Sequence, residues 1–177
     1  MNSSLEAVIK SRREDALLRR DTLSLIFRVI FIAAVAYLLF AKVFLITQMK
    51  GNDMFPALKD GDLIIAFRLQ QDYAKNDIAV FETGGAQHVS RVVALDSDVV
   101  ALNDSGTLII NGTVQGGEIF YPTYAGEGIA YPFRVPQNSM FFLGDNRTKA
   151  VDSRSFGPVP MEHVNGKVIT ILRRRGL

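Results

Sequence analysis

The sequence predicts a mainly β domain of packed antiparallel sheets behind one N-terminal transmembrane helix. Two observations lead to this prediction. An apolar run, residues 23–46 (LSLIFRVIFIAAVAYLLFAKVFLI), contains only two charged side chains, Arg28 and Lys42. After it, short stretches rich in Val and Ile are separated by Gly, Asn and Asp, as is typical of strands and their turns. We therefore expect a basic N-terminus at 1–22, a membrane anchor at 23–46 and a β domain at 47–177.

The apolar run fits a membrane span better than the alternatives. A helix of this length can cross a hydrocarbon core of about 30 Å, and Arg28 and Lys42 lie near its ends, where they can reach an interface. A buried core helix is disfavoured because aliphatic side chains surround the helix. A cleavable signal peptide is disfavoured because the run is too long and no small-x-small cleavage site follows it.

The flanking charge predicts the orientation. Five basic residues precede the run: Lys10, Arg12, Arg13, Arg19 and Arg20. Such residues stay in the cytoplasm, so we expect a single-pass protein of the cell membrane with its C-terminal domain outside. The first twenty residues could form a short amphipathic helix on anionic lipid or a mobile tail.

Composition excludes several classes of function. The net charge of +2 is too small to indicate a nucleic-acid partner. The chain has no cysteine, so it has neither disulfides nor a cysteine-based metal site. It has two histidines, too few for a histidine cluster, and we expect neither a metal nor a cofactor.

Beyond residue 47 we expect strands at 62–67, 77–81, 88–95, 99–103, 107–112 and 167–172. Asn111-Gly112 is a strong turn signal. Pro132 and Pro136 argue against a regular central strand between them. Residues 121–132 (YPTYAGEGIAYP) indicate a long loop with aromatic side chains.

Several sequence blocks in this domain have fixed order and spacing. The first is GNDMFPAL at 51–58, followed by Gly61-Asp62 and LIIAF. Further blocks are Asn76-Asp77 with IAVF, SRVVALDSD at 90–98, and GDNRTKAVDSRSFG at 144–157. Together they resemble the type I signal peptidases, membrane-anchored serine proteases that remove signal peptides from exported proteins. The motif GDNR followed at fixed spacing by DSR and FG is the most specific part, and the resemblance extends from about Leu23 to Leu172.

The resemblance implies a Ser–Lys dyad, but this chain lacks its reacting groups. Asp53 stands at the position of the nucleophilic serine, Ser90 at that of the lysine base, and Ala150 at that of a supporting serine. The mechanism requires a neutral lysine amine to take the proton of the serine hydroxyl. Since the members of a dyad act together, we expect that cleavage of this kind is lost.

What remains is the frame of the site. The resemblance places Gly51, Met54, Pro56 and Arg91 at the substrate groove or its frame. Met54, Phe55 and residues 121–133 are expected either at an apolar, membrane-facing surface or in the core. We expect structural ion pairs in the closing loops among Asp145, Arg147, Asp152 and Arg154, with Arg91 as a further partner.

Two unorthodox sites stay open. Asp53 could share a proton with Asp145 or Asp152, as in an aspartic pair. Ser90 could act as a nucleophile beside His88, because residues two apart on a strand share a face. A single histidine on a strand is more often a packed or surface residue.

A subset of signal-peptidase-like proteins in Gram-positive bacteria resembles this chain in lacking both serine and lysine. The resemblance implies a non-catalytic accessory or chaperone role in surface pilus polymerisation. Its expected partners are membrane lipid, an extended extracytoplasmic peptide or pilin subunit, and a sortase. The alternatives are an active signal peptidase with an unorthodox site, and a structural membrane protein whose groove is vestigial.

Overall fold

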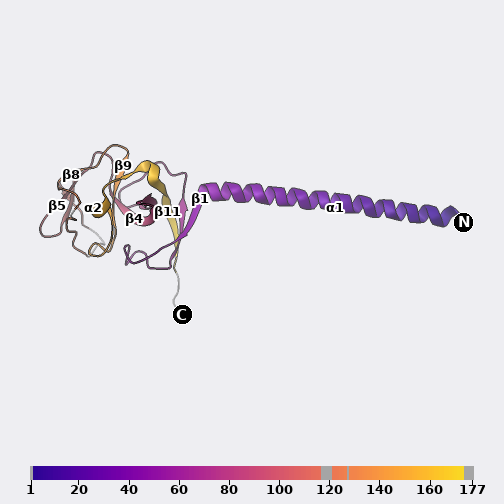
Figure 1. Cartoon of the computed structure of the whole chain (residues 1–177), viewed down its shortest axis with the longest axis horizontal. Coiled ribbons are helices and arrows are strands. Elements are labelled where there is room, and N and C mark those ends of the chain that lie inside the picture. Colours follow the sequence, from indigo (N-terminus) through magenta and orange to yellow (C-terminus); the bar gives the residue numbers. More distant parts are fainter. Residues whose placement is uncertain (1, 117–120, 127, 174–177) are drawn as a thin grey trace. The chain divides into compact units, whose positions relative to one another are not determined.

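The computed structural model describes residues 2–116, 121–126 and 128–173, with side chains from residue 19 onward. The chain divides into two compact units, Met1–Lys42 and Val43–Leu177. The first is helical and the second is built mainly from strands (Figure 1).

Helix α1 runs from Asn2 to Val43. Its segment from Arg19 to Val43 is apolar, exposed and long enough to cross a membrane. The basic residues that precede this segment belong to the same helix. The anchor expected at 23–46 ends earlier in the structure, because Phe44–Gln48 leaves the helix and forms strand β1, which pairs with the next strand.

In the described part of the chain, seven antiparallel strands form the larger sheet, in the order β1-β2-β11-β3-β4-β9-β10. After β1 the bounds are β2 Leu63–Phe67, β11 Val164–Leu172, β3 Ile78–Thr83, β4 Ala86–Ala94, β9 Ser139–Leu143 and β10 Val159–Pro160. The C-terminal strand β11 thus lies between β2 and β3. Helix α2 (Ser153–Phe156) and the 3₁₀ turn η1 (Met161–His163) connect the last strands.

The described residues also form a smaller sheet in the order β7-β6-β5-β8. Its strands are β7 Thr113–Val114, β6 Leu108–Ile110, β5 Val99–Leu102 and β8 Phe133–Arg134. Asn111 and Gly112 have φ angles of 51° and 80° and make the expected tight turn between β6 and β7. The short strand β8 lies between Pro132 and Pro136 and at an edge of the sheet, where flanking prolines are tolerated.

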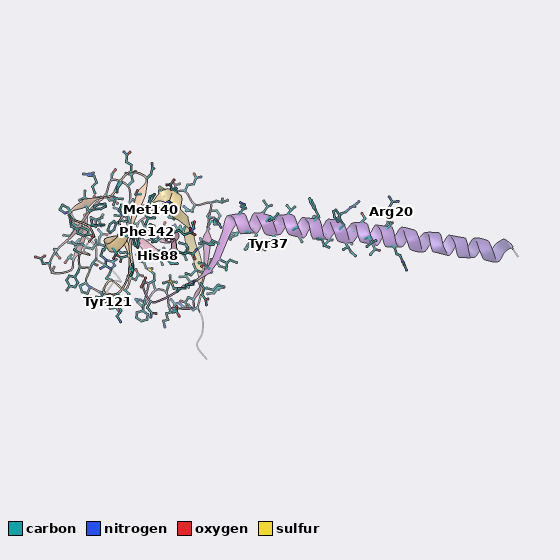
Figure 2. All side chains as sticks on the ribbon, in the orientation of Figure 1. Arg20, Tyr37, His88, Tyr121, Met140 and Phe142 are labelled. Carbon is teal, nitrogen blue, oxygen red and sulfur yellow. The ribbon has the colours of Figure 1, made fainter. Side chains whose placement is uncertain are left out.

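Strand β9 joins the two sheets because both of its faces are buried. Phe141 and Leu143 pack with buried residues of the smaller sheet, among them Val100. Met140 and Phe142 pack on the opposite side, where the rings of Phe142 and Phe81 stack with centroids 4.2 Å apart. Figure 2 shows Met140, Phe142 and His88 within this domain. The core therefore fixes the two sheets to each other.

The predicted mainly β, antiparallel architecture is confirmed, and each of the six predicted segments contains a strand. Strands β1 and β9 and the two-residue strands β7, β8 and β10 were not expected. The loop predicted at 121–132 contains no regular element over its described residues 121–126 and 128–132. Tyr124 in this loop is exposed.

Candidate functional site

The loop that carries Asp53 is held by its own backbone and by the core. Gly51 has a φ of 78°, a left-handed conformation that glycine adopts without steric cost, and its N–H donates to the Asp60 carboxylate at 2.7 Å. Met54 and Leu58 are completely buried in a core cluster. The peptide backbone around Asp53 is thus fixed in place.

Of the two alternatives for the apolar residues of this loop, Met54 takes the core and Phe55 the surface. Met54 has no exposed area, whereas 38% of Phe55 is exposed. Met54 therefore anchors the loop in the core and has no surface that a ligand could contact. Phe55 is the residue of this pair that is available to a partner or to lipid.

Residues 144–157, which follow β9 and are called the closing segment here, bind the backbone of the loop at 49–62 that carries Asp53 (the Asp53 loop). The N–H of Asn146 donates to the Asp53 carbonyl at 2.9 Å, and its side-chain amide donates to the Asn52 carbonyl at 3.2 Å. Gly144 packs so tightly that a Cβ there would lie 2.6 Å from the Asp53 carbonyl and would also meet the Cβ of Ala150. Asp53 and Ala150, far apart in the sequence, are therefore brought to one place.

The Asp53 carboxyl is partly buried and is close enough to charges of both signs to be influenced by them. Burial raises its pKa above the ordinary value, and the nearby charge of Asp152 acts in the same direction. A hydrogen bond from the Val151 backbone N–H and the charge of His88 act in the opposite direction. No lysine is among the described groups that influence Asp53. A serine at position 53 would therefore find no amine base among these groups.

Ser90 and His88 lie on β4, two residues apart and on the same face. Ser90 is 2% exposed and pairs across the strands with Ala79. The His88 ring packs on Phe81 and Phe156, with centroids 5.7 Å and 5.5 Å away. Within the described residues no hydrogen bond joins Ser90 to His88. The charge of His88 acts instead on Asp53, a relationship that sequence reasoning missed.

Asp152 is buried and saturated with donors. Its carboxylate accepts from Nε and Nη2 of Arg154, each at 2.8 Å, from the Gly144 N–H at 3.0 Å and from the Arg154 N–H at 3.1 Å. The hydroxyl of Ser153 accepts the N–H of Phe142 at 2.9 Å. The DSR motif thereby ties helix α2 to strand β9.

Asp145 pairs with Arg91 in the same bidentate manner. Nε and Nη2 of Arg91 donate to the two oxygens of Asp145 at 2.7 Å and 2.6 Å. Arg147 differs from the expectation that it joins these ion pairs. It donates to the Gly144 carbonyl at 2.9 Å and to the Thr123 hydroxyl at 2.7 Å, both neutral acceptors.

These contacts do not form an aspartic pair. Such a pair needs two carboxyls that share one proton. Both oxygens of Asp152 are occupied by Arg154 and Gly144, and both oxygens of Asp145 by Arg91. The charge of Asp152 does reach Asp53, but over the described residues no hydrogen bond joins them.

A pocket with a volume of about 990 Å³ lies beside this site. Pro56, Arg91, Asp145 and Arg147 are among its lining residues, whereas Asp53, Ser90 and Ala150 are not. Arg91 alternates along β4 with His88 and Ser90, so it points to the opposite face of the strand. Of the four residues expected at the groove or its frame, Pro56 and Arg91 line this pocket, whereas Gly51 and Met54 do not.

Comparison with known proteins identifies the family. The family model described as "Signal peptidase, peptidase S26" matches residues 22–172. The chain belongs to this family. The match covers the apolar helix, the Asp53 loop and the closing segment, and the last two of these form the site.

Several relatives of the signal peptidase family are similar to this chain. It is 31% identical over 136 residues to Signal peptidase I of Bacillus caldolyticus, covering 68% of this chain and 74% of the relative. It is 30% identical over 143 residues to Signal peptidase IB of Staphylococcus aureus, covering 68% and 73%. The membrane-anchor expectation is consistent with the apolar part of α1.

A plant relative and a solved structure are also similar to this chain. Probable thylakoidal processing peptidase 2 of Arabidopsis thaliana is 31% identical over 138 residues, but this chain spans only 36% of its length. A crystal structure of a signal peptidase I from Enterococcus faecalis V583 has 27% identity and a TM-score of 0.46, covering 56% of this chain and 98% of that one.

Proposed function

We propose that this protein is a membrane-anchored, non-catalytic member of the signal peptidase family that binds an extracytoplasmic polypeptide without cutting it. The proposed ligand is a pilin subunit during surface pilus polymerisation, and a sortase is proposed as a further partner. In this role the N-terminus is cytoplasmic and the β domain lies outside the membrane.

One observation carries the proposal. The backbone frame at Asp53 is intact, whereas the side chains needed for Ser–Lys chemistry are not there. Gly51, the buried Met54 and the Asn146 hydrogen bond hold the loop, yet its central residue is a carboxylate. A carboxylate is a weak nucleophile toward an amide, and no lysine is among the described groups that influence the Asp53 pKa. A frame of this kind can still hold an extended peptide.

An active peptidase with an unorthodox site is the second candidate. The observation that favours it is the proximity of His88 to Asp53, whose pKa the His88 charge lowers while burial raises it. A histidine beside a carboxylate is a pair that enzymes use for proton transfer. In this candidate, water or Ser90 would supply the attacking oxygen.

Photo-crosslinking in membranes tests the binding role. Val151 is 54% exposed, and its backbone N–H holds the Asp53 carboxyl, so a photoreactive residue at position 151 reports on a ligand at this place. We expect crosslinks to an uncut pilin precursor. The matched control is position 169, where Ile169 is 52% exposed on β11 and does not line the pocket.

The outcomes separate the three roles. Crosslinks to an uncut polypeptide at position 151 and not at 169 support binding without cleavage. A crosslinked polypeptide that is shortened by cleavage favours the active peptidase. Equal labelling at both positions, or none at 151, contradicts a ligand at this site and leaves the groove vestigial.

A further inference from the structure

The pocket beside the Asp53 loop contains an imbalance of buried charge. Three arginines and two aspartates lie in and behind its wall. Arg91 is neutralised by Asp145, with a shortest distance of 2.6 Å, and Arg154 by Asp152, at 2.8 Å. The fifth group, Arg147, is 5% exposed and lines the pocket. Among these described groups, one positive charge is therefore not matched by a carboxylate.

Not all hydrogen-bond donors of the Arg147 guanidinium have a partner among the described residues. Its Nε and Nη1 bind the Gly144 carbonyl and the Thr123 hydroxyl. Among the described residues, no carboxylate forms an ion pair with it, and its Nη2 has no hydrogen-bond partner. Burial lowers the pKa of Arg147 to about 10, so it is still a cation at neutral pH. The charges of Asp145 and Asp152 also act on Arg147, but each of these carboxylates is already paired with another arginine. Burying a cation that has no counter-ion of its own is costly, and an anion that enters the pocket would relieve this cost.

We propose that this pocket binds a carboxylate, with the Arg147 guanidinium as its principal contact. A guanidinium presents planar, paired donors that match a carboxylate. Among the described groups of this cluster the surplus is a single positive charge, which suits a monoanion. Asp145 lies on the same wall and would repel a dianion such as phosphate more strongly.

The pocket can take more than a small ion. Its volume of about 990 Å³ is at the upper end of the range for ligand pockets. Its wall includes Pro56 and Ala57, which belong to the same loop as Asp53. A polypeptide bound along this loop can place a glutamate or aspartate side chain in the pocket. In this form the inference rests on the proposed function, whereas binding of a free carboxylate does not.

The test measures binding to the full chain, labelled with ¹⁵N, in detergent micelles. The probes are the blocked peptides acetyl-Ala-Ala-Glu-Ala-Ala-amide and acetyl-Ala-Ala-Gln-Ala-Ala-amide, sodium acetate, and sodium chloride at equal ionic strength. The Arg147 Nε–H resonance in NMR spectra reports on the pocket. We expect the Glu peptide to bind at least about tenfold more tightly than the Gln peptide and to shift this resonance, because hydrogen bonds to a charged group are strong.

Two outcomes support the proposal and identify the source of the carboxylate. If the Glu peptide binds more tightly than acetate, the ligand is a polypeptide side chain. If acetate binds as tightly as the Glu peptide, and more tightly than chloride, the ligand is a small free carboxylate. Equal binding of the two peptides, with acetate no better than chloride, would overturn the proposal.

Two variants localise the effect. Arg147→Gln should remove the preference for the Glu peptide. Arg134→Gln removes the same charge from an exposed residue on β8 that does not line the pocket, and it should keep the preference. If both variants lose it equally, the preference comes from long-range charge and the proposal fails. If Arg147→Gln does not fold, the comparison of peptides on the unaltered chain still decides.

Failure here is distinguishable from failure of the proposed function. Crosslinks at position 151, together with equal binding of the Glu and Gln peptides and acetate no better than chloride, would refute the carboxylate pocket and keep the peptide-binding role. Discrimination between acetate and chloride without any crosslink at position 151 would keep the pocket and refute that role.

Discussion

Asp152 binds Arg154, only two residues further along the chain, through two hydrogen bonds of 2.8 Å to Nε and Nη2. Neither side chain faces solvent: Asp152 is completely buried and Arg154 is 7% exposed. The same carboxylate accepts the N–H of Gly144, so it connects α2 with the start of the closing segment. The pair thus forms a fixed connection (called the joint below) between α2 and the segment that binds the Asp53 loop.

Removing one partner of this joint should be strongly destabilising. Asp152→Ala leaves the Arg154 cation buried without its counter-ion, and we expect a loss of about 3–5 kcal/mol of unfolding free energy. Chemical denaturation of the purified chain measures the change. Glu162→Ala is the control, because Glu162 is exposed and lies 3.9 Å from His163, and it should change stability by less than about 0.5 kcal/mol. Equal effects of the two changes would show that Asp152 does not hold the fold.

A methyl group at Gly144 should disturb the place where the Asp53 loop meets the closing segment. A Cβ at this position would lie 2.6 Å from the Asp53 carbonyl and against Ala150. We expect Gly144→Ala to cost about 1–3 kcal/mol, as overpacking does. Gly116→Ala is the matched control, since nothing lies within 4 Å of a Cβ there. Thermal unfolding followed by circular dichroism compares them, and a Gly144→Ala chain as stable as the Gly116→Ala chain would contradict the close contact.

The Asp53 carboxyl should weaken the fold at neutral pH. Burial raises its pKa in the folded chain above the unfolded value of 3.8. The folded state then holds its proton more tightly than the unfolded state, so the stability that protonation provides is full below pH 3.8 and is lost as pH rises through the folded pKa. We expect Asp53→Asn to raise the melting temperature at pH 7 and to have a smaller effect as the pH falls toward 3.8.

The matched control for this pH dependence is Asp60→Asn in the same loop. Asp60 is exposed, and its carboxylate accepts the Gly51 N–H at 2.7 Å. Asp60→Asn removes the same negative charge from the same loop, so it controls for the change in net charge. A lower melting temperature for Asp53→Asn at pH 7, or a difference from the unaltered chain that is independent of pH, would contradict the assignment of a raised pKa.

Restoring the dyad should require changes at several positions together. Asp53→Ser alone supplies a hydroxyl without a base. Ser90→Lys alone places an ammonium near the Asp53 carboxylate, which raises the lysine pKa and keeps it charged. We expect weak cleavage of a signal peptide from the double variant and more from the triple variant with Ala150→Ser. If the triple variant folds but does not cleave, the surrounding groove has diverged as well.

Much of the fold was predictable from local chemistry. Val- and Ile-rich stretches identified six strands, and Asn111-Gly112 identified the turn between β6 and β7. Strand β9 was missed because both its faces are buried, so MFFL shows no alternation of polar and apolar residues. Strand β1 was missed because Phe44, Leu45 and Ile46 continue the apolar run of the anchor, and only pairing with β2 shows that they are a strand.

The sequence predicts part of the site and fewer of its contacts. The motif spacing predicts that Asp53 and Ser90 stand at the dyad positions and Ala150 at that of a supporting serine. It also predicts the pairing of Asp152 with Arg154, which the structure contains. The neutral partners of Arg147 could not be predicted, since Thr123 lies in a loop without regular structure. The approach of His88 to Asp53 depends on how the loop packs against β4, which sequence spacing does not encode.

The most direct measurement of the central claim is mass spectrometry of a signal-peptide-bearing pilin precursor after incubation with the unmodified full chain in lipid vesicles. We expect the precursor to remain intact over many hours, while the variant with Asp53→Ser, Ser90→Lys and Ala150→Ser produces the processed form. Processing by the unmodified chain that disappears when Asp53 is changed to Asn would contradict a non-catalytic role and would establish an unorthodox peptidase.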